Sequence, residues 1–162
     1  AVLGGGVIGA GWVARLIENG HDVAVFDPAP DAERRLNESL ANADAAYAKL
    51  FTAPRRPKGR VRMAASVADA AQGADLIVEA VPERLEIKHS VYAEAETTAA
   101  PDALIASSTS GIKPTDLQGP LRHPGRLLVA HPFNPVYLLP VVEIVGGQRT
   151  AEEAIAKAMA FY

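Results

Sequence analysis

The chain has 162 residues, of which 49% are hydrophobic and 22% charged, proportions that are ordinary for a globular protein with one core. Its net charge of −3 gives no reason to expect a nucleic acid or an anionic membrane as partner. The absence of cysteine excludes disulfides, thiolate metal sites and cysteine nucleophiles, and no metal site is visible. No apolar run approaches the roughly 20 residues that a membrane helix needs.

Apolar strands alternate with helical segments along the chain, which is typical of a parallel sheet with helices on both faces. We therefore expect a doubly wound, mostly parallel sheet of the Rossmann type. Strands are predicted at 2–3, 21–26, near 61, and at 75–81, 103–107, 127–130 and 141–145. Helices are predicted over 7–19, from a cap at Asp31 through Leu50, after a capping box at Ser66 and Asp69, and over 83–99 and 151–162.

The first predicted strand is followed by the segment Gly4-Gly5-Gly6-Val7-Ile8-Gly9, which has the G-x-G-x-x-G form. Gly4 would permit the tight turn, Gly6 would let backbone approach a pyrophosphate, and Gly9 would allow close packing of helix on strand. Asp27 ends the second strand, where an acidic side chain accepts hydrogen bonds from the adenosine ribose and repels a 2′-phosphate. This combination predicts NAD as cofactor; the alternative is a glycine-rich turn with Asp27 facing solvent.

His131 and Glu143 are candidates for a general base and its orienting acid. His131 ends one predicted strand, and Glu143 lies in the next among β-branched residues, where we expect it to be partly buried and to need a partner. If the two side chains meet across neighbouring strands, Glu143 stabilises the imidazolium and His131 takes a proton from a substrate hydroxyl near neutral pH. In the alternative, Glu143 faces water on an edge strand.

Two further polar side chains are candidates for holding a substrate oxygen. Asn134 lies in a turn between Pro132 and Pro135, where its amide either orients the reacting oxygen or bonds its own turn. Ser110 follows the fifth strand at its C-terminal end, where doubly wound sheets bind ligands; the alternative for Ser110 is a helix cap.

The sequence resembles the NAD-binding domain of the L-3-hydroxyacyl-CoA dehydrogenase superfamily over essentially its full length. The matching segments are the Gly4–Gly9 turn, residues 78–83 with Lys88, the serine-rich turn at 107–110, and His131-x-x-Asn134-Pro135 with Glu143. The resemblance implies that His131 and Glu143 form the catalytic pair. It implies that Ser110 and Asn134 position the substrate oxygen and the histidine. It also implies that Glu83 and Lys88 lie along the nicotinamide side of the cofactor.

The resemblance also implies a domain organisation. Residues 1–147 would form the NAD-binding domain, and residues 148–162 would begin a helix that leads toward a second, all-helical domain through which the full-length protein forms a homodimer. The chain starts within a strand and ends within a helix, so we expect a longer polypeptide, and a targeting segment before Ala1 stays open. NAD use without a visible targeting signal leads us to expect a cytoplasmic protein.

Within the superfamily the sequence is most similar to the L-carnitine dehydrogenase branch, which implies NAD-dependent oxidation of the 3-hydroxyl of carnitine. The similarity lies in the segments 11–15, 27–30, 107–111 and 131–140. Carnitine carries a trimethylammonium group, which aromatic faces attract. Phe133 and Tyr137 beside the catalytic turn are therefore candidate substrate contacts, with core packing as their alternative, and that alternative is favoured more for Phe133.

Other functions stay open. L-3-hydroxyacyl-CoA oxidation would bring a substrate with phosphates, which the basic loop at 55–60 could meet, but a solvated basic turn is the favoured interpretation of this loop. A sugar-acid dehydrogenase similar to the lambda-crystallin-like enzymes is a further small-molecule enzyme. A non-catalytic NAD-binding protein is disfavoured, because the set of four candidate catalytic residues is intact.

Overall fold

The computed structural model describes residues 1–162 and contains one seven-stranded sheet, in the order β3-β2-β1-β4-β5-β6-β7. Neighbouring strands are parallel except at β7, which runs antiparallel to β6. This confirms the doubly wound, mostly parallel sheet that the sequence predicts. The strands are β1 (Val2–Leu3), β2 (Val23–Phe26), β3 (Val61–Met63), β4 (Leu76–Glu79), β5 (Leu104–Ser107), β6 (Leu127–Pro132) and β7 (Val142–Gly146).

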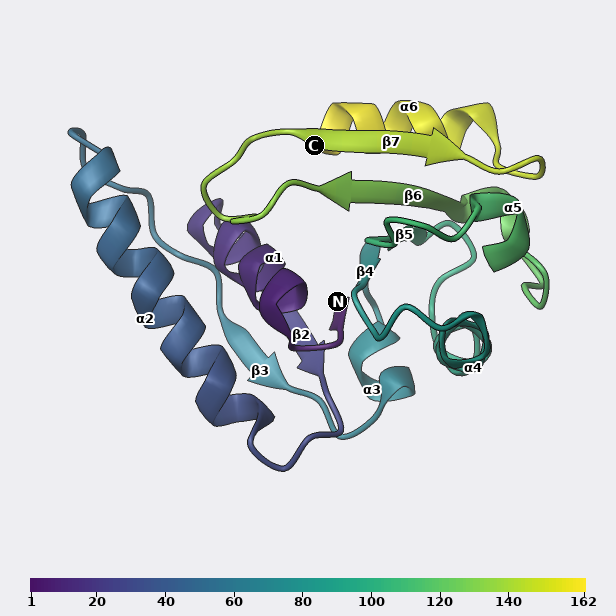
Figure 1. The fold of residues 1–162 in the computed structure, drawn as a ribbon, viewed down its shortest axis with the longest axis horizontal. Coiled ribbons are helices and arrows are strands. Elements are labelled where there is room, and N and C mark those ends of the chain that lie inside the picture. The colour runs from purple at the N-terminus through teal and green to yellow at the C-terminus, as the bar shows by residue number, and fades with distance from the viewer.

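Helices cover both faces of the sheet (Figure 1). On one face lie α1 (Val7–Glu18), α2 (Ala32–Leu50) and α6 (Glu152–Phe161), and the apolar stripe of α1 packs on β1, β2 and β4. On the other face, a core cluster joins α3 (Val67–Ala71), α4 (Leu85–Ala95) and α5 (Pro114–Leu117) to the sheet. A short 3-10 turn, Pro124–Arg126, leads into β6.

Local signals in the sequence placed some element ends correctly. Gly20 adopts a φ of 86° just after α1, as expected for a C-terminal cap. Ser66 caps α3 by accepting a hydrogen bond from the Asp69 amide at 3.0 Å. The prediction was wrong at the start of α4, which begins at Leu85, so that Glu83 lies in the preceding loop.

The helix at the end of the chain packs on the sheet. Ala154 and Ala158 of α6 lie in a cluster with Leu128 and Ala130 of β6, and α6 contacts β7 as well. Residues 152–161 therefore share the core of the sheet. None of the helices combines the length and the apolar character that crossing a bilayer requires.

Candidate active site at the carboxyl edge of the sheet

The candidate residues lie mainly where parallel strands end. The glycine turn follows β1, Asp27 follows β2, Glu79 ends β4, and Ser107 ends β5. Ligands of doubly wound sheets bind at this carboxyl edge, near the point where the strand order reverses. In this sheet the reversal falls between β1 and β4, directly beside the glycine turn.

The glycine turn has the backbone geometry of a phosphate cradle. Gly4 has a φ of 97°, and a Cβ at Gly9 would lie 1.8 Å from the carbonyl oxygen of Gly4, so neither position tolerates a side chain. A Cβ at Gly6, by contrast, would meet nothing within 4 Å. The amide of Ala10 donates to the carbonyl of Gly6, which leaves the preceding amides of the first helical turn free for an anion. The turn therefore fits a pyrophosphate.

Asp27 is tied to this turn. Its carboxylate accepts hydrogen bonds from the amides of Gly5 at 2.7 Å and Ala29 at 2.9 Å. A carboxylate has about four acceptor positions, so two remain for ribose hydroxyls. The solvent-facing alternative for Asp27 does not describe this arrangement.

A buried charge network lies beneath the edge, between β4, β5 and α4. The Glu79 carboxylate, which is 0% exposed, accepts hydrogen bonds from Lys88 Nζ at 2.7 Å, Tyr92 Oη at 2.5 Å and Ser107 Oγ at 2.6 Å, and from the Val81 amide at 2.9 Å. Burial, and then the Glu79 charge, raise the pKa of Tyr92 well above its ordinary value, so Tyr92 stays a donor.

Glu83 connects this network to the serine-rich turn. Its Oε2 lies 3.3 Å from Lys88 Nζ, and its Oε1 accepts hydrogen bonds from the Thr109 hydroxyl and from the amides of Ser110 at 3.1 Å and Gly111 at 3.0 Å. Burial alone would raise the pKa of Glu83, but these hydrogen bonds and the Lys88 charge outweigh it and lower the pKa. Glu83 therefore stays ionised and holds the turn.

His131 and Glu143 meet across β6 and β7. The two residues are register partners, and His131 Nδ1 lies 2.9 Å from Glu143 Oε2. A carboxylate only accepts, so Nδ1 carries the hydrogen and Nε2 keeps a lone pair for a proton. The Glu143 side chain is 59% exposed on an edge strand, so the expected burial was wrong, while the pairing with His131 is present.

A cavity of about 250 Å³ brings several of these residues together. Its wall contains Ser110, Lys113, His131, Glu143 and Val145. Ser110 does not cap a helix, because the cap of α5 is Lys113, and Thr109 makes the local hydrogen bond to the amide of Ile112. The Ser110 hydroxyl has no hydrogen bond within the chain and can serve a ligand.

Four further predicted site residues lie outside the wall of this cavity. Asn134 is exposed and outside the wall of this cavity, and its side chain makes no hydrogen bond to its own turn. Tyr137 packs against Tyr47 of α2, with ring centroids 6.1 Å apart, whereas Phe133 lies beside His131 at 6.0 Å and is 42% exposed. The core-packing alternative therefore describes Tyr137 and not Phe133. Lys88 is buried and contacts Glu79 and Glu83.

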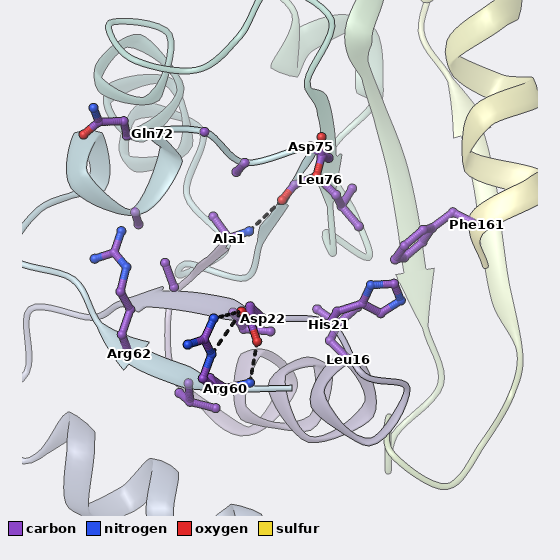
Figure 2. A pocket seen from close by; sticks show the side chains of 16 residues that line it. Ala1, Leu16, His21, Asp22, Arg60, Arg62, Gln72, Asp75, Leu76 and Phe161 are labelled. Carbon is purple, nitrogen blue, oxygen red and sulfur yellow. Dashed lines mark hydrogen bonds and ion pairs between the residues drawn. The ribbon is translucent and has the colours of Figure 1, made fainter. Parts of the chain in front are cut away.

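Two larger cavities lie away from His131. Figure 2 shows one of about 740 Å³ at the amino edge of the sheet, where Arg60 pairs with Asp22. Another, of about 450 Å³, lies between α1, α2 and the loop before β7. Neither cavity is the candidate active site, because ligands of this fold bind at the carboxyl edge of the sheet.

In the basic loop at 55–60, Arg55 and Lys58 each form an ion pair with Asp44 at 2.6 Å.

Sequence reasoning missed the roles of Glu79, Tyr92, Ser107 and Lys113. A glutamate at the end of an otherwise apolar strand is the signal that could have identified Glu79, since a buried carboxylate needs partners. Lys88 and Tyr92, four residues apart on α4, lie on one helix face and could have been proposed as those partners.

The chain matches a known family model over its whole described length. The model is that of the 3-hydroxyacyl-CoA dehydrogenase, NAD binding domain, and it matches residues 1–162. The chain belongs to this family. The cofactor of the domain is accordingly NAD, in agreement with the prediction from the glycine turn and Asp27.

Curated relatives extend beyond the matched region. The chain is 55% identical over 159 residues to an L-carnitine dehydrogenase/betainyl-CoA thioesterase of Rhizobium sp., covering 98% of the chain and 32% of that protein. It is 53% identical to the L-carnitine dehydrogenase of Mesorhizobium japonicum, covering 100% of the chain and 45% of that protein. It is 50% identical to the L-carnitine dehydrogenase of Pseudomonas aeruginosa, covering 100% of the chain and 50% of that protein. The chain thus spans between a third and a half of these relatives.

Solved structures share the fold. A 5-formyl-3-hydroxy-2-methylpyridine 4-carboxylic acid 5-dehydrogenase, described as an NAD+-dependent dismutase, superimposes with a TM-score of 0.91 at 36% identity, over 98% of this chain and 52% of that one. The 3-hydroxybutyryl-CoA dehydrogenase of Escherichia coli superimposes with a TM-score of 0.87 at 27% identity, over 99% of this chain and 35% of that one. One domain therefore serves substrates with and without a CoA group.

Proposed function

We propose that this chain is the cofactor-binding part of an NAD-dependent dehydrogenase that oxidises the 3-hydroxyl of L-carnitine. The observation that carries the proposal is the His131–Glu143 pair, which lines one cavity with Ser110 at the carboxyl edge of the sheet. The names of the relatives support carnitine as substrate. A cytoplasmic location and a homodimer formed through a helical domain are further proposals that rest on the family resemblance.

In the proposed mechanism, NAD when bound supplies the nicotinamide that accepts a hydride. His131 takes the hydroxyl proton on Nε2, and Glu143 stabilises the imidazolium that results. The Ser110 hydroxyl donates a hydrogen bond to the substrate oxygen as it becomes a carbonyl. Glu83 fixes the backbone of Ser110 and thereby the direction of its side chain.

Charges around the cavity support a zwitterionic substrate. Lys113 on the wall has no carboxylate within ion-pair distance, so its ammonium is available for the carboxylate of a substrate. Phe133 presents an exposed ring beside His131, to which a trimethylammonium group would be attracted. Arg55 and Lys58, the alternative partners for CoA phosphates, are instead paired with acidic residues of α1 and α2.

The test is NADH formation by the longest natural polypeptide that carries this chain, with L-carnitine and L-3-hydroxybutyryl-CoA assayed side by side. We expect activity with carnitine. His131→Gln should lower kcat by about 10²–10⁴-fold, the usual contribution of a general base, and leave NADH affinity unchanged. Lys113→Gln should raise KM for carnitine and spare kcat, because its ammonium binds substrate and takes no part in proton transfer.

Each outcome has a defined meaning. Activity on the CoA ester alone would overturn carnitine as substrate and keep the dehydrogenase. A His131→Gln variant with equal losses in turnover and NADH affinity would overturn the role of His131 as base. An unchanged KM in Lys113→Gln would remove Lys113 from the substrate site.

A further inference from the structure

Glu79 is a buried charge for which the proposed chemistry has no direct use. It ends β4 on the same face of the sheet as Ser107, its register partner in β5, and His131 lies on that face of β6. Four hydrogen bonds saturate its carboxylate, so it has no free acceptor for a ligand. Any contribution to the site must therefore pass through its partners.

Lys88 connects buried Glu79 to Glu83 at the surface of the site. Its side chain is 1% exposed, and its ammonium lies between two carboxylates, 2.7 Å from Glu79 Oε1 and 3.3 Å from Glu83 Oε2. Glu79 is buried, whereas the Glu83 side chain is 44% exposed, so the ammonium links the interior to the surface of the site. The position of Glu83 depends on where Glu79 holds this ammonium.

Glu83 in turn sets the serine-rich turn. One of its oxygens accepts hydrogen bonds from three consecutive residues, Thr109 to Gly111, and its other oxygen faces Lys88. Ser110 is the middle residue of the three, and it lines the cavity that contains His131. If the ammonium moved toward Glu83, that carboxylate would rotate and the three hydrogen bonds to the turn would weaken.

Stability alone is a poor explanation for such a network. A buried ion pair loses the hydration of both charges, and apolar residues of similar volume often give equal or greater stability. The network also ends at the exposed side of the site and not within the core. A positioning role accounts for both features.

We propose that Glu79 is a positioning residue that acts through Lys88 and Glu83 on the Ser110 turn, at the carboxyl edge of the sheet where the NAD site lies. The proposal rests on the NAD site described above. Tyr92 and Ser107 complete it by fixing the second oxygen of Glu79, so that the carboxylate presents Oε1 to Lys88.

The experiment measures NADH affinity of this chain by energy transfer from Trp12 to bound NADH. Trp12 is the one tryptophan, and its indole donates to Ser108 in the serine-rich turn, so it lies next to the site. We expect Glu79→Gln to weaken NADH binding by ten-fold or more. The matched control is Glu96→Gln, which breaks the other buried ion pair, with Arg126, at the far end of α4. It should leave affinity within two-fold of the wild type.

A second variant separates positioning from folding. Glu79→Leu with Lys88→Met replaces the pair by apolar side chains and should fold, yet we expect it to bind NADH as weakly as Glu79→Gln. Wild-type affinity in either variant would overturn the proposal, as would an equal loss in Glu96→Gln. If the unmodified chain bound no NADH, the NAD site itself would be overturned, which is a result distinct from failure of Glu79 alone.

Discussion

The two sides of the carboxyl edge differ in how far their charged side chains are exposed to solvent. On the cofactor side, the Lys88 and Glu79 side chains are 1% and 0% exposed. On the substrate side, His131 and Glu143 are 31% and 59% exposed, and a single hydrogen bond joins them. The charged groups of the proposed cofactor side are thus paired within the chain, whereas Ser110, Lys113 and Phe133 stay free on the proposed substrate side. Such an arrangement, in which a rigid scaffold positions residues that are free to bind a ligand, is typical of binding sites.

The largest effect is expected from breaking the buried pair on the cofactor side. Lys88→Met leaves the Glu79 charge buried with three neutral donors, which should lower the free energy of unfolding by about 3–5 kcal/mol. Adding Glu79→Leu should restore part of this loss, because no unpaired charge remains, whereas Tyr92, Ser107 and the Val81 amide lose their acceptor. Urea denaturation of the two variants and the wild type measures both changes. Strictly additive losses in the double variant would contradict a coupled pair.

Substitutions in the glycine turn should have intermediate effects on stability. Two of them distinguish a loss of packing from a loss of NADH binding. Gly9→Ala forces a Cβ against the carbonyl oxygen of Gly4 and should cost about 1–3 kcal/mol of stability together with NADH binding. Gly6→Ala meets nothing in the protein, so stability should change by less than about 0.5 kcal/mol. Its NADH affinity should nevertheless fall, since the new methyl group occupies the phosphate cradle. Thermal unfolding and NADH titration of both variants test this, and unchanged NADH binding in Gly6→Ala would move the phosphates elsewhere.

On the proposed cofactor side, the sequence predicted the features that depend on neighbouring residues and missed those that depend on contacts between distant segments. A glycine turn between a strand and a helix, and an acid after the second strand, are patterns within a few residues. The partners of Glu79 come from β5 and α4, and only the strand register and the seating of that helix reveal them. The predicted helix over 83–99 would contain both Glu83 and Lys88, but α4 starts after Glu83 and the contact arises from the loop.

On the proposed substrate side, the sequence predicted the pairing of His131 with Glu143 but not the surroundings of the two residues. His131 and Glu143 were predicted to pair, and they do; the β-branched neighbours of Glu143 suggested burial, which the edge position of β7 prevents. Tyr137 and Phe133 exchanged their expected roles, because the loop after β6 turns toward α1 and α2 through the buried Val136. Such a path depends on packing between distant segments, which spacing does not encode.

Only a small effect on stability is expected from the exposed pair, in contrast to the effect of Lys88→Met. Glu143→Gln removes a solvent-exposed ion-pair partner, so the free energy of unfolding should change by less than about 1 kcal/mol. Gln can still accept from Nδ1, but it no longer stabilises the imidazolium, so kcat should fall while NADH affinity stays constant. Urea denaturation, NADH titration and turnover with carnitine give the three values. A stability loss as large as that of Lys88→Met would mean that Glu143 supports the fold, and the division of the edge into a fixed cofactor side and an open substrate side would then be wrong.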